Sequence, residues 1–120
     1  MSDMVNNVQH YSQAAGTLEP IDVINNGPFD LGNAIKYLCR AGHKDDESQD
    51  ILKAYRYIIE AINSYRHDPS PYDYWCQHNL VYLKKLKPFK DVNSTDAKSL
   101  IFELTATIDK RLVELGLQND

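Results

Sequence analysis

The sequence predicts an all-α fold, in which a central pair of antiparallel helices is followed by further helices toward the C-terminus. Apolar side chains recur at the spacing of an amphipathic helix in several segments, whereas no segment alternates convincingly over the length of a strand. The chain of 120 residues has the size of one ordinary domain. We therefore expect a small helical domain in residues 1–65 and a helical extension in residues 66–120 that packs on it, as one structural unit.

The first two predicted helices lie in the first third of the chain. Pro20 suits the first turn of a short helix in the segment LEPIDVINN, and Gly27-Pro28 cannot continue it. Asp30 is the expected N-cap of a second helix that runs to about Arg40. Gly42 then closes this helix, because glycine readily adopts the backbone angles of a C-terminal cap.

Three more helices are predicted in the rest of the chain. The longest covers about residues 48–65, with an expected apolar stripe of Ile51, Tyr55, Ile58, Ile59 and Ile62. The segment RHDPSPYDYW interrupts the helical pattern, and a further helix is expected within residues 72–86. Ser94 or Thr95 is the expected cap of the last helix, which ends before Gly116. Its apolar stripe contains Leu100, Ile101, Leu104, Ile108, Leu112 and Leu115.

Composition and apolar patterning limit which partners we expect the protein to bind and in which compartment we expect it to lie. A formal net charge of −4 argues against binding of bulk nucleic acid, and no apolar run is long enough for a transmembrane helix. The first residues lack the pattern of a secretory signal, and the two cysteines form no CxxC pair, so we expect reduced thiols and a cytoplasmic location. Long apolar stripes in a short chain also predict a homo-oligomer, whose expected seam is Leu104, Ile108, Leu112 and Leu115.

Positive charge is concentrated in one short stretch. Residues 1–35 contain no Lys or Arg, whereas residues 31–44 contain no Asp or Glu but carry Lys36, Arg40, His43 and Lys44. A local group of cations in an acidic chain suits a small anion better than a long polyanion. Alternatively, these cations pair with the acidic run that follows them, which consists of Asp45, Asp46, Glu47 and Asp50.

Polar side chains share one face of each helix in the central pair. On the helix predicted from residue 30 to residue 40, the core face comprises Leu31, Ala34, Ile35 and Leu38. Its opposite face comprises Asn33, Lys36, Tyr37 and Arg40, all of which can donate hydrogen bonds. On the next helix, Asp50, Lys53 and Tyr57 lie opposite the isoleucine stripe. Antiparallel helices joined at residues 42–44 would bring the two polar faces around one pocket.

These residue types fit a phosphate-bearing ligand. Lys36 and Arg40 are suited to hold phosphate oxygens, and backbone N–H groups near Gly32 and Asn33 would add to an anion site. The rings of Tyr37, Tyr57 or Tyr11 are suited to stack on a base. The structural alternative is that Lys36 and Arg40 pair with Asp50 and Asp22 across the helices, while the tyrosines are partly buried.

The motifs of several enzyme classes are missing from the sequence. It contains no GxxxxGK[ST] loop, which excludes an ordinary P-loop kinase. The acidic run of residues 45–50 could bind Mg²⁺ through one or two carboxylates, and its other interpretation is the N-terminal cap of the following helix. The four histidines show no ligand spacing, so we predict no protein metal site.

Several runs in the first half of the chain occur together in one known group of proteins. They are His10-Tyr11, EPIDVI at residues 19–24, GNAIKYLCRAGHKD at residues 32–45, and DILKA at residues 50–54 followed by Tyr57. Over about residues 7–65 the chain resembles a family of small bacteriophage proteins that is labelled nucleotide-kinase-like. Most members have no assigned function, and at least one is similar to a nucleoside monophosphate kinase that lacks the usual phosphate-binding loop. This chain departs from its relatives at His43, where they commonly carry another basic residue.

The resemblance implies a phage-encoded nucleotide-binding protein of the host cytoplasm, which phosphorylates (deoxy)nucleoside monophosphates if it is active. Lys36, Arg40 and Lys44 would neutralise phosphate charge, and Asp50 and Asp45 are the candidate catalytic carboxylates. The implied nucleotide site further contains Asn33, Tyr37, Lys53, Tyr57, His10 and Tyr11. Two non-enzymatic alternatives stay open: an oligomer that sequesters a host nucleotide or nucleotide-derived signal, and a helical inhibitor of a host protein.

Overall fold

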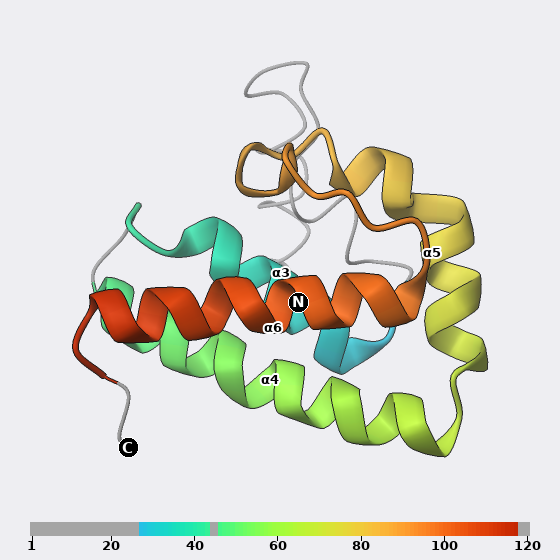
Figure 1. Cartoon of the computed structure of the whole chain (residues 1–120), viewed down its shortest axis with the longest axis horizontal. Helices are drawn as coiled ribbons and strands as arrows, with labels where there is room; N and C mark the ends of the chain where they lie inside the picture. Colours follow the sequence, from blue (N-terminus) through green and yellow to red (C-terminus); the bar gives the residue numbers. More distant parts are fainter. Residues whose placement is uncertain (1–26, 44–45, 118–120) are drawn as a thin grey trace, which may run out of the picture.

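The computed structural model describes residues 27–43 and 46–117, and in these ranges the predicted all-α fold is confirmed (Figure 1). The described helices are α3 (Phe29–Arg40), α4 (Glu47–His67), α5 (Ser70–Leu83), the short 3-10 helix η1 (Lys87–Phe89) and α6 (Ala97–Glu114). No strand occurs in this part of the chain, and none of its helices is both long and apolar enough to cross a membrane. The short helix predicted in LEPIDVINN lies outside the described residues.

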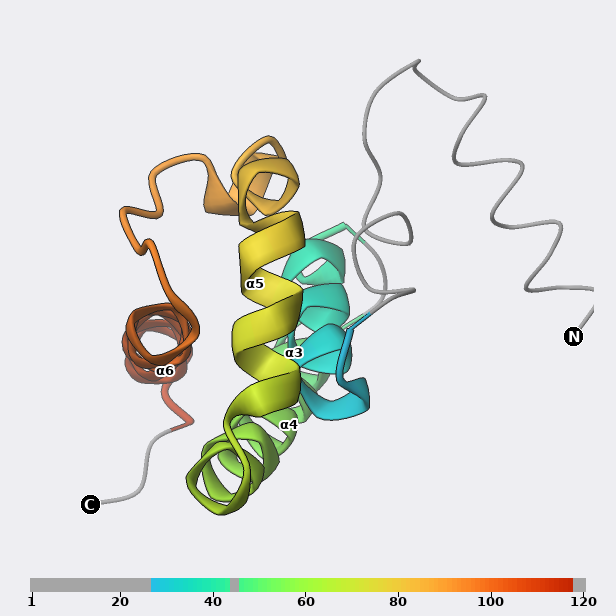
Figure 2. The same ribbon diagram turned by 90° about the vertical axis from the view of Figure 1, so that its right-hand side faces the viewer.

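The predicted antiparallel pair consists of α3 and α4. The end of α3 meets the beginning of α4, where Arg40 faces Asp50, and the beginning of α3 meets the middle of α4, where Phe29 contacts Tyr57. The two helices therefore run in opposite directions. Helix α6 lies along α4 as well, and α5 crosses both helices (Figures 1 and 2). As a result, α4 has neighbours on two sides.

One hydrophobic core joins all of these helices. The four residues predicted for the core face of α3 are all buried. Trp75 of α5 is fully buried, and a Cβ atom at Gly27 would lie only 2.5 Å from the Nε1 atom of its indole, so this position requires glycine. The largest fully buried side chains come from both halves of the chain: Leu31, Ile35, Ile51, Ile58, Trp75, Leu83, Phe89, Leu100, Leu104 and Ile108.

The apolar stripe predicted for α4 is partly wrong. Ile51 and Ile58 are buried, but Tyr55 and Ile59 remain 39% and 36% exposed. Alanines take their place in the core: Ala54 and Ala61 are fully buried. A helix with neighbours on two sides needs small residues where the backbones approach closely, and a pattern that counts large apolar side chains overlooks them.

Two predicted N-caps are also wrong. Pro28, not Asp30, is the N-cap of α3, so the carboxylate of Asp30 lies within the first turn of the helix. Asp96 caps α6 by accepting a hydrogen bond from the backbone N–H of Ser99 at 2.8 Å, in place of the expected Ser94 or Thr95. This hydrogen bond lowers the pKa of the Asp96 carboxyl. The correct cap in each case lies within two residues of the predicted one.

The boundaries of the two middle helices differ by a few residues from those predicted. Helix α4 begins one residue earlier than expected and ends two residues later. Helix α5 covers residues 70–83 instead of 72–86, because Pro71 lies in its first turn, where a missing N–H costs little. Its last predicted turn is replaced by a turn that leads into η1.

The apolar stripe of α6 is confirmed, but the seam proposed on it is wrong. Leu104, Ile108 and Leu112 are buried in the core of their own chain, and Leu115 is partly buried against it. These side chains are therefore not exposed to a second copy. The helix ends before Gly116, as predicted. Self-association of the chain stays a prediction, and the large apolar side chains that α6 leaves exposed are Phe102 and Val113, at 67% and 62%.

Candidate functional site on the α3–α4 face

Four predicted site residues meet on the outer face of the α3–α4 pair. The ring of Tyr37 stacks on that of Tyr57, with the two ring planes 6° apart and their centroids 6.0 Å apart. The ammonium groups of Lys36 and Lys53 lie 5.2 Å and 5.3 Å from the centroid of the Tyr37 ring. We call these four residues the tyrosine–lysine cluster. It forms because Lys53 and Tyr57 are one turn apart on α4, beside the outer face of α3.

The tyrosine–lysine cluster combines aromatic surface with positive charge. A cation over an exposed ring contributes about 0.5–1 kcal/mol, and an aromatic pair about 0.5–1.5 kcal/mol beyond its buried area. Neither lysine forms an ion pair with a carboxylate among the described residues. Both ammonium groups carry positive charge beside one ring, so an anion bound at this ring would interact favourably with each of them.

Arg40 and Asp50 form an ion pair beneath the outer face, with 3.4 Å between Arg40 Nε and the Asp50 carboxylate. The Asp50 side chain is only 5% exposed, whereas that of Arg40 is 39% exposed. The prediction that Asp50 lies on a polar face opposite the isoleucines is therefore wrong, because the carboxylate is buried between the helices. For Arg40, the structure contains the ion pair that formed the structural alternative to phosphate binding.

The beginning of α3 differs from the predicted anion site. The N–H of Gly32 donates to the Pro28 carbonyl at 2.9 Å, and the side-chain amide of Asn33 donates to the Phe29 carbonyl at 3.0 Å. Both groups are used within the helix, because it starts earlier than expected. Sequence reasoning missed Phe29, which is 74% exposed and contacts Tyr57 edge-on at 5.9 Å between ring centroids. Phe29 lies two helical turns before Tyr37, and this spacing was the sequence signal that could have placed Phe29 beside the cluster.

The turn between the two helices is partly described. Gly42 has φ of +85°, a left-handed conformation that other residues rarely adopt, and this confirms its predicted role after α3. The predicted site residues Lys44 and Asp45 lie outside the described residues. The same holds for His10, Tyr11 and the predicted ion-pair partner Asp22.

The described part of the acidic run is engaged in structural contacts. Asp46 is the N-cap of α4 and accepts a hydrogen bond from the N–H of Ser48 at 2.9 Å, which confirms the cap interpretation for this residue. Glu47 binds Arg111 of α6, which also binds Glu114, and the hydrogen bond to Glu47 is the largest cause that raises the pKa of this guanidinium. Sequence reasoning missed Arg111, because the contact spans 64 residues. No group of three possible metal ligands occurs in the described ranges.

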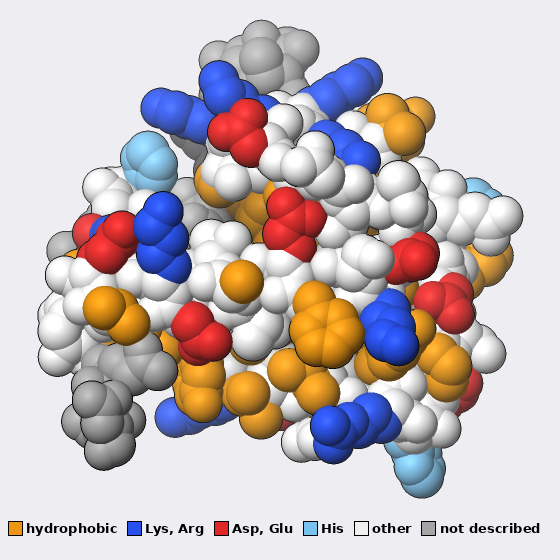
Figure 3. All heavy atoms as spheres, in the orientation of Figure 1, with side chains coloured by type: hydrophobic (Ala, Val, Ile, Leu, Met, Phe, Trp, Pro, Cys, Tyr) orange, Lys and Arg blue, Asp and Glu red, His pale blue; other side chains and the backbone are white. Residues whose placement is uncertain are grey.

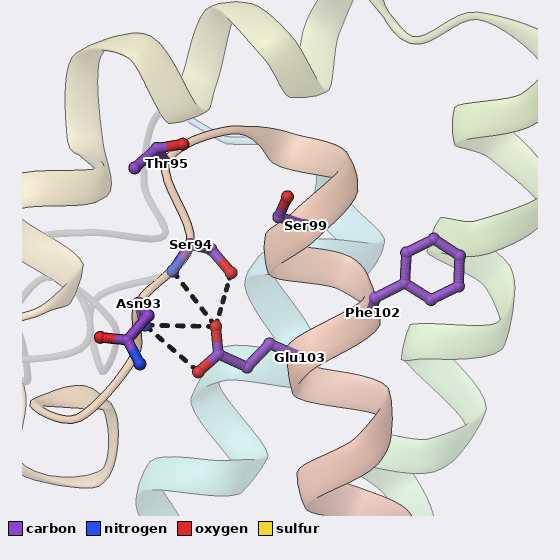
Figure 4. A pocket seen from close by; sticks show the side chains of 6 residues that line it. All are labelled: Asn93, Ser94, Thr95, Ser99, Phe102 and Glu103. Atoms are coloured by element: carbon purple, nitrogen blue, oxygen red, sulfur yellow. Dashed lines mark hydrogen bonds between the residues drawn. The ribbon is translucent and has the colours of Figure 1, made fainter.

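Two surface hollows of about 510 Å³ each lie away from the tyrosine–lysine cluster. In the first, beside the N-terminus of α6, the carboxylate of Glu103 accepts hydrogen bonds from the N–H groups of Asn93 and Ser94 and from the Ser94 hydroxyl (Figure 4). These bonds hold the chain that enters α6. The second hollow lies between the end of α4 and the beginning of α5, and its lining includes His67 and Tyr72. Neither hollow is lined by a residue of the tyrosine–lysine cluster.

The comparison with known families agrees with the extent of the sequence resemblance. Residues 5–64 match the family described as a protein of unknown function (DUF3310). This range contains the whole tyrosine–lysine cluster and ends within α4, before α5 and α6. The description of the family assigns no activity. No curated protein and no solved structure matches the chain.

Proposed function

We propose that this chain, which belongs to the DUF3310 family, binds a nucleotide at the tyrosine–lysine cluster. The ligand presents a phosphate to the ammonium groups of Lys36 and Lys53, and its base lies against the aromatic side chains beside them. The observation that carries the proposal is the placement of both ammonium groups within 5.3 Å of the Tyr37 ring centroid, with no carboxylate partner among the described residues.

A nucleotide satisfies both parts of this surface at once. Each ammonium offers three hydrogen-bond donors to phosphate oxygens, and the exposed ring of Phe29 extends the aromatic surface next to Tyr57. Stacking of a base on an aromatic side chain contributes about 1–3 kcal/mol. Inorganic phosphate would use only the lysines, and a nucleoside only the rings. We therefore expect a nucleotide to bind more tightly than either half of it.

Binding is supported better than phosphoryl transfer. A kinase neutralises charge on a donor and on an acceptor and needs a residue that takes up the proton of the acceptor. Of the two candidate catalytic carboxylates, Asp50 faces Arg40 and is buried, which leaves it poorly placed to meet a ligand. The proposed function is therefore nucleotide binding without efficient turnover, and this favours sequestration of a nucleotide over a kinase.

Calorimetry with a panel of ribo- and deoxyribonucleotides tests the binding site. We expect micromolar or tighter affinity for at least one nucleotide. Lys36→Met and Lys53→Met should each weaken it about tenfold to a hundredfold, because each removes a charge-assisted hydrogen bond. Lys98→Met on α6 is the matched control, because it removes the same charge from an exposed helix position elsewhere. Unchanged affinity in both cluster variants would place the site elsewhere.

A product assay separates binding from catalysis. The protein is incubated with each deoxynucleoside monophosphate and a triphosphate donor, with and without Mg²⁺, and the products are resolved by chromatography. We expect slow transfer or none. Turnover of about 1 s⁻¹ or faster, as in kinases, that Asp50→Asn abolishes would refute the proposal of a non-catalytic binding protein.

A further inference from the structure

The outer face of α5 exposes apolar side chains where an amphipathic helix normally exposes polar ones. Its inner face packs into the core through Trp75, Leu80 and Leu83. On the outer face, Tyr74 is 65% exposed, Val81 68% and Tyr82 48%. These three residues recur at helical spacing and cover about 12 Å along the helix. Exposed Gln77 and His78 share this face, and the ring of His78 lies 4.3 Å from that of Tyr74, so the outer side of α5 is a mixed surface in which three large apolar side chains stay uncovered.

Positive charge follows directly after this face of α5. Four lysines lie within seven residues: Lys84, Lys85, Lys87 and Lys90. None of them forms an ion pair among the residues that the structure describes, and Lys85 places its ammonium 5.5 Å from the centroid of the Tyr82 ring. Lys and Arg side chains gather at the top of the molecule, above the segment between α5 and α6 (Figure 3). A helix end attracts positive charge, but Lys87 and Lys90 lie beyond the end of α5.

We propose that this α5–η1 surface, formed by Tyr74, Val81, Tyr82 and the four lysines, binds an acidic segment of a partner protein that also carries apolar side chains. Carboxylates of the segment face the lysines, and its apolar side chains cover Val81 and the exposed rings. The binding is independent of nucleotide binding on the α3–α4 face, because the two surfaces share no residue.

Charge and side-chain type select this partner over a long polyanion. The whole chain has a net charge of −4, so a long nucleic acid is repelled by the chain as a whole, whereas a short acidic peptide is held mainly by the four lysines. The α5–η1 surface contains no arginine, the side chain that pairs bidentately with phosphate. It contains instead the exposed aliphatic side chain of Val81. A nucleic-acid base cannot stack on this side chain, whereas an apolar side chain of a peptide can pack against it.

Fluorescence anisotropy with labelled 12-residue peptides tests the proposal. The probes are a peptide of alternating Glu and Leu, one of alternating Glu and Ser, and one of alternating Lys and Leu. We expect the Glu/Leu peptide to bind most tightly, the Glu/Ser peptide more weakly and the Lys/Leu peptide not at all. Affinity for the Glu/Leu peptide should fall as salt is raised, because surface charge interactions are screened.

Matched variants locate the binding. Lys87→Glu/Lys90→Glu should weaken the affinity for the Glu/Leu peptide about tenfold. Val81→Ser should remove most of the difference in affinity between the Glu/Leu peptide and the Glu/Ser peptide. Lys98→Glu/Lys110→Glu on α6 changes the net charge equally and should leave the affinity within about twofold. Equal losses in both double variants, or no binding of the Glu/Leu peptide at millimolar concentration, would overturn the proposal. Tighter binding of a dodecamer of deoxythymidylate, or of vesicles with anionic lipids, would also overturn it.

Discussion

Two polar regions border helix α3, and they differ in how their charge is balanced. The buried region consists of two separate sites at the two ends of α3: at its beginning Asp30 accepts hydrogen bonds from the Tyr72 hydroxyl at 2.8 Å and 2.9 Å, and at its end Arg40 faces Asp50 of α4. On the outer face, Lys36 and Lys53 share the ring of Tyr37, and neither has a carboxylate partner among the described residues. The two buried carboxylates thus serve the fold, whereas on the proposed function the two ammonium groups bind the ligand.

This difference predicts opposite consequences for substitutions in the two regions. A buried carboxylate that loses its partner retains its desolvation penalty, so changes in the buried region should reduce stability. The half-buried Lys36 and the exposed Lys53 contribute to stability mainly through their contacts with the Tyr37 ring, so changes at these lysines should reduce ligand affinity more than stability.

The largest effect is expected for Arg40→Met. It leaves the Asp50 carboxylate buried without its ion-pair partner, and we expect a loss of about 2–4 kcal/mol in the free energy of unfolding. Urea denaturation followed by circular dichroism measures it. The double variant Arg40→Met/Asp50→Asn removes the buried charge as well and should recover part of the loss. Full stability of Arg40→Met would show that the pair does not hold α3 to α4.

A smaller loss is expected for Tyr72→Phe. The ring still fills its place in the core, but Asp30 loses the hydroxyl that donates to it, at a cost of about 1–3 kcal/mol. Tyr74→Phe, at an exposed position on the same helix, is the matched control and should change stability by less than about 0.5 kcal/mol. Equal stabilities of the two variants would contradict the role of the Asp30–Tyr72 pair.

The same pair predicts how stability changes at high pH. Burial, together with the hydrogen bond to Asp30, raises the pKa of Tyr72 from its ordinary value of 10.0 to about 12. A raised pKa means that the folded state holds the phenol proton more tightly than the unfolded state does. The contribution of this proton is therefore complete below pH 10.0 and is lost as the pH rises toward about 12. In denaturation series, Tyr72→Phe should lose less stability over this interval than the unchanged protein.

The smallest loss in stability is expected at the turn that joins the two helices. Gly42→Ala forces a Cβ atom into a left-handed conformation with φ of +85°, at a cost of about 1–2 kcal/mol. Gly116→Ala, with φ of +71° after α6, should cost about as much. On the proposed function, only Gly42→Ala also weakens nucleotide binding, because it shifts the helices that carry the cluster. Equal affinities in both variants would contradict this link.

The sequence predicted local features of this fold well. The core face of α3, the antiparallel pairing of α3 with α4, and the convergence of Lys36, Tyr37, Lys53 and Tyr57 all follow from helical spacing. Spacing is a property of neighbouring residues, so it can be read without knowledge of the tertiary structure. It also shows which side chains share a face, though not what covers that face.

The remaining features depend on contacts between distant parts of the chain. Asp30 looks like a cap until Tyr72, 42 residues later, packs over it. Asp50 looks like a free carboxylate on a polar face, yet the approach of α3 buries it beside Arg40. The alanines of α4 have no amphipathic signal of their own, and they become core residues only because two helices pack against α4.

The most direct test of the central claim measures stability and nucleotide affinity on the same two variants. Lys36→Met/Lys53→Met should lose at most about 1–2 kcal/mol in the free energy of unfolding, the contribution of its two cation–π contacts, and at least about tenfold in nucleotide affinity. Tyr72→Phe should lose about 1–3 kcal/mol in stability and keep an unchanged affinity. If the lysine variant instead loses more than about 2 kcal/mol in stability and binds the nucleotide as before, its two ammonium groups belong to the fold, and the account of the outer face is wrong.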